Sequence, residues 1–321
     1  METLIINQKN NKLKQEQRWQ EWIRKKIDFY ISTNKWDRVS IIKFHSWLEN
    51  FDDIGKKYAL AILNHFIYYS EVEVKQLCKN VIKKVIFKDQ LLNTEESNDF
   101  HCSDKMLNNE LENRIQETLI APLLSEGNPT ESGNYIAREY TTTGLIKQEQ
   151  VIRPDEIITR IQQRSCKRIL FVDDFLGTNV QLTNFWNNEN IPIGIGNKKK
   201  SLIMISNQYP TVNFEYVSLV ATEYGLENIQ ERVPGLKVYY CEKLTNEYRI
   251  FNEKSIFFED QNDRINCKNY LENLCNNKNI PIYGVHGLDF AIAFYHGAPN
   301  SCLPIFWKSS RNWEPLFSRR M

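Results

Sequence analysis

Residues 168–182 read RILFVDDFLGTNVQL and carry the clearest structural signal in the chain. The apolar run at 169–172 predicts a buried strand. Two adjacent carboxylates, Asp173 and Asp174, follow that run, and a short polar turn then leads into a predicted helix over 180–187. In an open parallel sheet, ligands bind beyond the carboxyl ends of the strands. We therefore expect both carboxylates to end a central strand and to be solvent-accessible in a cleft.

The groups that this segment exposes suggest its chemistry. A turn that enters a helix presents backbone N–H groups without intrahelical partners, which favour phosphate, and Thr178 adds a hydroxyl donor. Asp173 and Asp174 repel phosphate, so we expect them to face the hydroxyls of a ribose or the water around a bound Mg²⁺. Together these features predict a cradle for ribose 5-phosphate. The simpler alternative is an acid pair that only caps a strand or a helix start.

The rest of the chain after residue 120 alternates between predicted strands and helices. Helices are expected at 157–163 and 180–187. Short apolar runs rich in β-forming residues predict strands at 168–172, 202–205, 214–220 and 236–240, and 135–140 is a candidate for the first strand. This alternation favours an α/β fold with a largely parallel sheet covered on both faces.

The first ninety residues predict helices only, because four apolar stripes recur at helical spacing. A polar break at 88–105 suggests a domain boundary, and a further helix from Leu107 to Leu119 is expected to end at Pro122. We therefore predict a small helical domain over 1–90, a linker over 91–109 and a parallel-sheet domain over 110–321.

The composition argues against several functional classes. Lys and Arg number 41 and Asp and Glu 40, so no chain-wide charge attracts nucleic acid or anionic lipid. Residues 1–43 hold ten basic and five acidic side chains. This local excess of positive charge could contact nucleic acid, or it could belong to helix faces that are exposed to solvent. The seven cysteines form no C-x-x-C pair, no apolar run reaches the roughly 20 residues of a membrane helix, and we find no secretion signal. We expect a cytoplasmic protein with reduced thiols and no membrane contact.

The segment 168–182 resembles the PRPP-binding motif of type I phosphoribosyltransferases, in which an apolar strand is followed by two acidic residues and a Thr/Gly-rich turn. The resemblance implies that Asp173 and Asp174 contact the ribose hydroxyls, hold Mg²⁺ and serve catalysis. It also implies a phosphate site formed by Gly177, Thr178, Asn179, Val180 and Gln181. The turn departs from the usual Thr-Thr-Gly-x-Thr at positions 177, 179 and 181, although Asn179 tolerates a left-handed backbone conformation.

Residues 110–321 also resemble a phosphoribosyltransferase-like group of bacterial conflict and phage-defence systems, on the segments FVDDFLGT and APNSCLPIFWKSSRNWEPLFSR. The N-terminal module is similar to the winged-helix-like region of these proteins. Two functions are left open. The first is an enzyme that carries out Mg²⁺-assisted transfer or hydrolysis at the anomeric carbon of a PRPP-type ligand. The second is a catalytically degenerate fold that senses a nucleotide, or contacts a protein partner through the N-terminal module.

Weaker candidates lie outside this segment. Ser132 and Gly133 occupy an expected loop that, by the same resemblance, would contact pyrophosphate; the alternative is a surface turn. His286 could act as a general acid or base, or could be an ordinary turn residue. Asn300 and Ser301 could recognise a base or a partner, or could belong to a proline-ordered loop that packs the nearby tryptophans.

Overall fold

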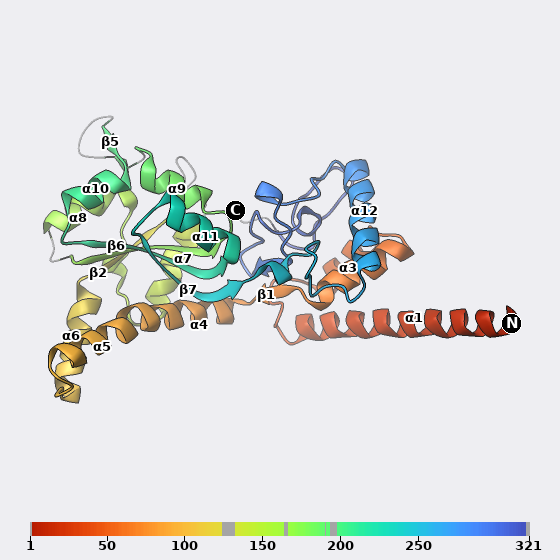
Figure 1. Cartoon of the computed structure of the whole chain (residues 1–321), viewed down its shortest axis with the longest axis horizontal. Coiled ribbons are helices and arrows are strands. Elements are labelled where there is room, and N and C mark those ends of the chain that lie inside the picture. Colours follow the sequence, from red (N-terminus) through yellow and green to blue (C-terminus); the bar gives the residue numbers. More distant parts are fainter. Residues whose placement is uncertain (1, 124–131, 164–165, 190, 193–197, 319–321) are drawn as a thin grey trace. The chain divides into compact units, whose positions relative to one another are not determined.

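The computed structural model describes residues 2–123, 132–163, 166–189, 191–192 and 198–318. The chain divides into two compact units, one formed by 1–71 with 246–320 and the other by 72–245 (Figure 1). This division differs from the predicted boundary near residue 90, because the C-terminal residues pack with the N-terminal helices rather than with the parallel sheet.

The unit of residues 72–245 contains a four-stranded parallel sheet in the order β2-β3-β6-β7. The strands are β2 (Thr118–Pro122), β3 (Arg168–Leu176), β6 (Asn213–Thr222) and β7 (Lys237–Leu244). A short antiparallel pair, β4 (Ile191–Pro192) and β5 (Lys199–Lys200), stands apart from this sheet. The predicted α/β class is therefore confirmed.

Helices cover both faces of this sheet (Figure 1). One face packs against α8 (Ile157–Gln163), α9 (Val180–Asn187), α10 (Leu202–Gln208) and α11 (Glu223–Arg232). On the other face α7 (Ser132–Thr142) packs against β2 and β3. The remaining helices of the unit are α4 (Glu71–Ile82), a π-helical segment (Lys83–Lys88), α5 (Asp89–Ser97) and α6 (Asp104–Gln116).

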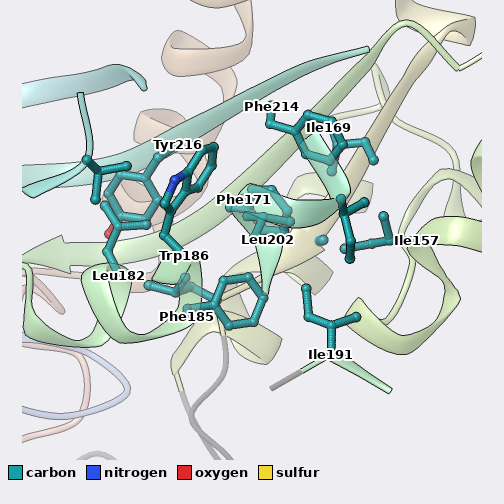
Figure 2. Packing of buried hydrophobic residues seen from close by; sticks show 14 of the residues in the cluster. Ile157, Ile169, Phe171, Leu182, Phe185, Trp186, Ile191, Leu202, Phe214 and Tyr216 are labelled. Atoms are coloured by element: carbon teal, nitrogen blue, oxygen red, sulfur yellow. The ribbon is translucent and has the colours of Figure 1, made fainter. Parts of the chain in front are cut away.

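The core of the sheet's first face is built on alternate strand residues. Ile169 and Phe171 of β3 and Tyr216 of β6 are at most 1% exposed, and they meet Phe185 of α9 (Figure 2). The rings of Phe171 and Phe185 pack edge to face with centroids 5.4 Å apart. Each such buried side chain stabilises the fold by about 1.5–3 kcal/mol, so this cluster fixes the register of β3 against β6.

Three expected elements differ in the structure. Residues 202–205 form α10 and not a strand, because Ser201 accepts a hydrogen bond from the Met204 N–H and so caps the helix. Residues 135–140 lie in α7, with Ile136 and Tyr140 buried at helical spacing. Residues 118–122 form the edge strand β2 instead of ending a helix, and an edge strand accepts Pro122.

The other predicted elements of this sheet are confirmed at α8, α9, β3, β6 and β7. The predicted linker over 91–109 is largely helical, since it contains most of α5 and the first part of α6. No described helix is long and apolar enough to cross a membrane.

The second unit joins the two ends of the chain. Its helices are α1 (Glu2–Ser32), α2 (Ile41–Leu48), α3 (Asp53–Asn64) and α12 (Gln261–Lys278). Strands β1 (Ile67–Tyr69) and β8 (Ile292–Phe294) pair in parallel. The indole N–H groups of Trp47 and Trp313 both donate to the carbonyl of Ile305, at 3.1 and 3.0 Å. The N-terminal region is helical as expected except at β1, which differs from the prediction of helices only over residues 1–90 because these residues pair with β8. The winged-helix likeness stays a prediction.

Helices α3 and α12 contact each other at Gly55. A Cβ at this position would overlap the ring of Tyr270, whose hydroxyl donates to Asp52 Oδ1 at 2.9 Å. The same oxygen accepts the Gly55 N–H at 2.7 Å and caps α3. The absence of a side chain at Gly55 therefore permits this interhelical contact.

We predict that Gly55→Ala lowers the free energy of unfolding. Overpacking costs about 1–3 kcal/mol, which exceeds the gain of about 1 kcal/mol in helix propensity. Urea denaturation would measure the loss. In a double-mutant cycle with Tyr270→Leu the two effects should be less than additive, because the smaller side chain removes the overlap. Additive effects, or a Gly55→Ala protein more stable than the parent, would contradict this packing.

Candidate functional site

The carboxyl ends of β2, β3 and β6 lie along one edge of the parallel sheet, since the strands run in the same direction. After β3 and β6 the chain enters α9 and α11, and after β2 it reaches α7. Residues 124–131, between β2 and α7, lie outside the described residues. The residues predicted to form the ribose-phosphate cradle, at 173–174 and 177–181, belong to this edge or to the strand that leads to it.

The two carboxylates of the predicted cradle are both buried, contrary to the expected exposure in a cleft. Strand β3 continues through Leu176, so Asp173 and Asp174 lie within it and not beyond its end. Asp173 is 4% exposed and Asp174 is fully buried. The reason is that β6 pairs with β3 as far as Leu176, which encloses both residues.

Side chains alternate along a strand, so the two carboxylates point to opposite faces of the sheet. Asp173 Oδ1 accepts the hydroxyl of Ser132 at 2.8 Å and the backbone N–H of Asp174 at 2.9 Å. Asp174 faces the interior near α4, where burial raises the pKa of the Cys78 thiol well above its usual range and the nearby carboxylates of Glu139 and Asp174 raise it further. Of the two adjacent acids, Asp173 thus lies at the edge of the sheet and Asp174 lies in the interior of the fold.

The turn after β3 is held in a left-handed conformation. Asn179 has φ 59° and ψ −2° and is the residue before α9. Its side-chain amide donates to the carbonyl of Gly225 at 3.3 Å. This confirms that the turn tolerates Asn in place of the usual residue, because a short polar side chain accepts this conformation at modest cost.

A second contact fastens the same turn to α11. The hydroxyl of Thr222 donates to the carbonyl of Gly177 at 2.6 Å and accepts the N–H of Gly225 at 2.9 Å, which caps α11. A Cβ on Gly225 would lie 2.8 Å from the Gly177 oxygen. Sequence reasoning missed Thr222 and Gly225; the signal was a threonine directly after an apolar strand, which is typical of a helix N-cap.

The predicted phosphate donors have different surroundings. The hydroxyl of Thr178 has no hydrogen-bond partner among the described residues, and this side chain is half-buried. The first turn of α9, from Val180, presents backbone N–H groups that no helical carbonyl accepts. The side-chain amide of Gln181 instead donates to the carbonyl of Leu123 at 3.4 Å. Thr178 and the helix start are therefore the groups of this turn best suited to an anion.

Ser132 and Gly133 begin α7 rather than forming a loop before a strand. A Cβ on Gly133 would lie 2.5 Å from the carbonyl oxygen of Leu123, so glycine permits the start of α7 to press against the end of β2. Ser132 reaches Asp173 across this contact. Ser132, Asp173 and Gln181 thus lie at one edge of the sheet, whereas Asp174 is buried inside the fold.

The other weaker candidates, His286, Asn300 and Ser301, belong to the second unit. His286 is exposed with φ 56°, and the carbonyl of Asn300 accepts the Val285 N–H at 2.9 Å. A Cβ on Gly284 would meet the backbone of Asn300 and Ser301, which indicates loop packing. Within the described ranges no cluster of three or more His, Cys, Asp or Glu side chains is arranged to hold a metal ion.

The chain is similar to solved structures and matches the profile of one protein family. Among solved structures, the xanthine-guanine-hypoxanthine phosphoribosyltransferase of Helicobacter pylori is 13% identical, covers 57% of this chain and 88% of its own, and gives a TM-score of 0.30. The AQ2163 protein of Aquifex aeolicus is 11% identical, with 70% and 92% covered and a TM-score of 0.29. No curated protein matches.

The PRTase-CE family profile matches residues 44–319, which includes the parallel sheet, the turn at Asn179 and most of the second unit. Because this match extends over far more than half of the sequence, the chain belongs to the PRTase-CE family and has a phosphoribosyltransferase-like fold.

Proposed function

We propose that the edge formed by Asp173 and the turn 177–181 binds a ribose-5-phosphate ligand of the PRPP type. The observation that carries the proposal is the left-handed turn at Asn179, fixed by the Thr222 hydrogen bond and followed at once by a helix start. A helix start offers fixed N–H donors to a phosphate. Thr178, whose hydroxyl has no partner among the described side chains and backbone groups, would supply one further donor to the same phosphate.

Asp173 would hold the ribose in this arrangement. Its Oδ1 already accepts two hydrogen bonds, and a carboxylate has further lone pairs that can accept ribose hydroxyls. Ser132 orients the carboxylate through the 2.8 Å hydrogen bond. We assign the ligand contact to Asp173 and not to Asp174, since Asp174 is fully buried on the opposite side of the strand.

The proposed reaction is transfer or hydrolysis at the anomeric carbon. The bond from C1 to the pyrophosphate oxygen breaks, and its electron pair leaves with pyrophosphate. A lone pair of the acceptor, or of water, forms the new bond to C1, and the acceptor loses one proton. Fixed donors that position the two ends of the ligand can accelerate such a step without a reactive side chain.

Mg²⁺ fits this site as a ligand-borne ion. It is usually held by one or two carboxylates together with substrate phosphates and water, and Asp173 supplies one carboxylate. When bound, the ion would neutralise charge on the departing pyrophosphate. We further propose that the activity serves bacterial defence against phage.

A second candidate function is a nucleotide sensor that has lost catalysis. It is favoured by the burial of Asp174 and by the contact between Gln181 and Leu123, which takes away one expected phosphate donor. In that case the fold would bind its ligand without turnover and pass the signal to a protein partner through the N-terminal helices.

We predict that Asp173→Asn reduces pyrophosphate release from PRPP and Mg²⁺ by at least about 100-fold, as expected for the loss of a charged hydrogen-bond acceptor worth about 1.5–3 kcal/mol together with its metal contact. The fold should persist, because the amide oxygen of Asn can still accept the hydroxyl of Ser132. Colorimetric detection of pyrophosphate would measure the activity. Full activity in Asp173→Asn would refute the enzyme proposal, whereas PRPP binding without release by the parent protein would support the sensor.

The defence role has its own test. Bacteria that express the parent protein should form fewer phage plaques than bacteria that express Asp173→Asn at the same level. Equal plaque numbers in the two strains would exclude a role for this site in defence, whatever its chemistry.

We predict that Thr178→Val weakens binding of ribose 5-phosphate by about ten- to hundredfold, since a hydrogen bond to a charged group contributes about 1.5–3 kcal/mol. Thr211→Val is the matched control, because it makes the same substitution at an exposed position before β6, at the edge of the sheet opposite the turn. Calorimetric titration should give unchanged affinity for the control. If Thr178→Val binds as tightly as the parent, the turn does not hold the phosphate.

A further inference from the structure

The outward face of α1 carries two large aromatic side chains. The helix packs into its unit through Ile23, Ile27 and Ile31, which are at most 7% exposed. Trp22 and Phe29 lie on the other side of the helix and are 57% and 62% exposed. Seven residues are close to two helical turns, so both rings lie on one face, about 10 Å apart along the helix. Single exposed apolar residues are common, but two rings aligned on one helix face indicate a contact surface.

Basic side chains lie between and beside these rings. Lys14, Arg18 and Lys25 follow each other at spacings of four and seven residues, which places them on the same helix face as the two rings. All three basic side chains are exposed. We call this face the α1 stripe, and it consists of Lys14, Arg18, Glu21, Trp22, Lys25 and Phe29.

The stripe has an excess of positive charge. Glu21 pairs with Lys25 at 2.7 Å, so the other two basic groups are not neutralised within the stripe. The side chains of Lys14 and Arg18 have no hydrogen-bond or ion-pair partner among the residues that the structure describes. Asp28, beside the stripe, contacts a histidine of α2 at 3.1 Å. Two cations are therefore available to an anionic partner.

Neighbouring groups hold one of the rings in place. Lys26 donates to the backbone and side-chain oxygens of Asn64 at 2.8 and 2.9 Å, so its ammonium group is anchored on α3. This group lies 5.6 Å from the centroid of the Trp22 ring, within the range of a cation–π contact. Trp22 thus presents its exposed surface in a fixed orientation.

The mixed character of the stripe selects among partners. A second copy of the chain would bring the same basic side chains against each other, and like charges at an interface oppose association. A helix that lies on a membrane buries a continuous apolar face, but the apolar face of α1, at Ile23 and Ile27, is already in the protein core. Single-stranded nucleic acid offers phosphates to the cations and unstacked bases to the rings.

We propose that the α1 stripe binds a single-stranded nucleic acid. Its two rings would stack on bases, and its basic side chains would contact phosphates. A duplex fits less well, because its bases stack on each other and are hidden from the rings. Neither kind of contact reads the sugar, so RNA and DNA strands are equivalent ligands. The stripe belongs to the second unit, so the proposal does not depend on the ribose-phosphate site.

Fluorescence anisotropy of labelled oligouridine and oligothymidine of equal length, titrated with the full chain, tests the proposal. Both strands should bind with similar affinity, and a duplex of the same length should bind more weakly at the same ionic strength. Affinity should fall as salt rises, because binding releases cations from the phosphates. Arg18→Gln should make the slope of log affinity against log salt shallower by about 0.7, the value for one phosphate contact to a single strand. Arg232→Gln is the matched control, since Arg232 is exposed on α11 in the other unit.

Leucine substitutions separate stacking from general apolar contact. Trp22→Leu and Phe29→Leu keep an apolar side chain and remove the ring, and each should weaken the binding of both strands by about tenfold. Trp22→Phe should retain most of the affinity. Phe100→Leu is the matched control, because Phe100 is 71% exposed and lies in the other unit. Circular dichroism verifies that the variants fold, which we expect because these rings lie mostly in solvent.

Absence of binding by both strands, unchanged affinity in Trp22→Leu, or equal effects of Arg18→Gln and Arg232→Gln on the salt slope would overturn the proposal. So would self-association, measured by sedimentation, that Trp22→Leu abolishes while neither strand binds, since the stripe would then contact a second copy. Binding of the strands at the ribose-phosphate edge would not respond to the α1 variants, which keeps this test separate from that of the proposed function.

Discussion

The hydrogen bond from the Thr222 hydroxyl to the Gly177 carbonyl, at 2.6 Å, ties the end of β6 to the turn after β3. The same hydroxyl caps α11 through Gly225, so one side chain sets the start of a helix and the path of the neighbouring turn. The two segments approach so closely that Gly225 has no room for a Cβ. The left-handed Asn179, the direction of α9 and the donors that α9 presents all depend on this contact.

The alternation of side chains along β3 gives the two adjacent acids different roles. Asp173 lies at the edge and is oriented by Ser132, whereas Asp174 points into the interior toward α4. A buried carboxylate requires compensation from its surroundings, which makes its position sensitive to the packing of α4 and α7. The two acids are therefore not equivalent as ligands, because only Asp173 lies at the edge of the sheet beside Ser132.

The unit formed by 1–71 and 246–320 depends on contacts between residues far apart in sequence. Phe66 and Phe317 stack with ring centroids 4.8 Å apart, and Trp36 meets Phe317 edge to face at 5.6 Å. Strand β1 also has no partner in its own part of the chain and pairs with β8. The N-terminal helices therefore share one aromatic core with the C-terminal tail and cannot be regarded as a separate module.

The sequence alone determined the local elements whose pattern is unambiguous. A buried β-rich run followed by acids, a Gly/Asn turn and an amphipathic segment specified β3, the left-handed Asn179 and α9, because each feature depends on nearby residues. Short segments were ambiguous: the apolar run 202–205 became α10 because Ser201 caps it, and the six residues 135–140 became α7. Periodicity cannot separate a short buried strand from a short buried helix. The roles of Thr222 and Gly225, the separation of Asp173 from Asp174 and the union of the two chain ends were decided only by tertiary structure, because they arise from contacts between segments whose distance in space is not encoded by local spacing.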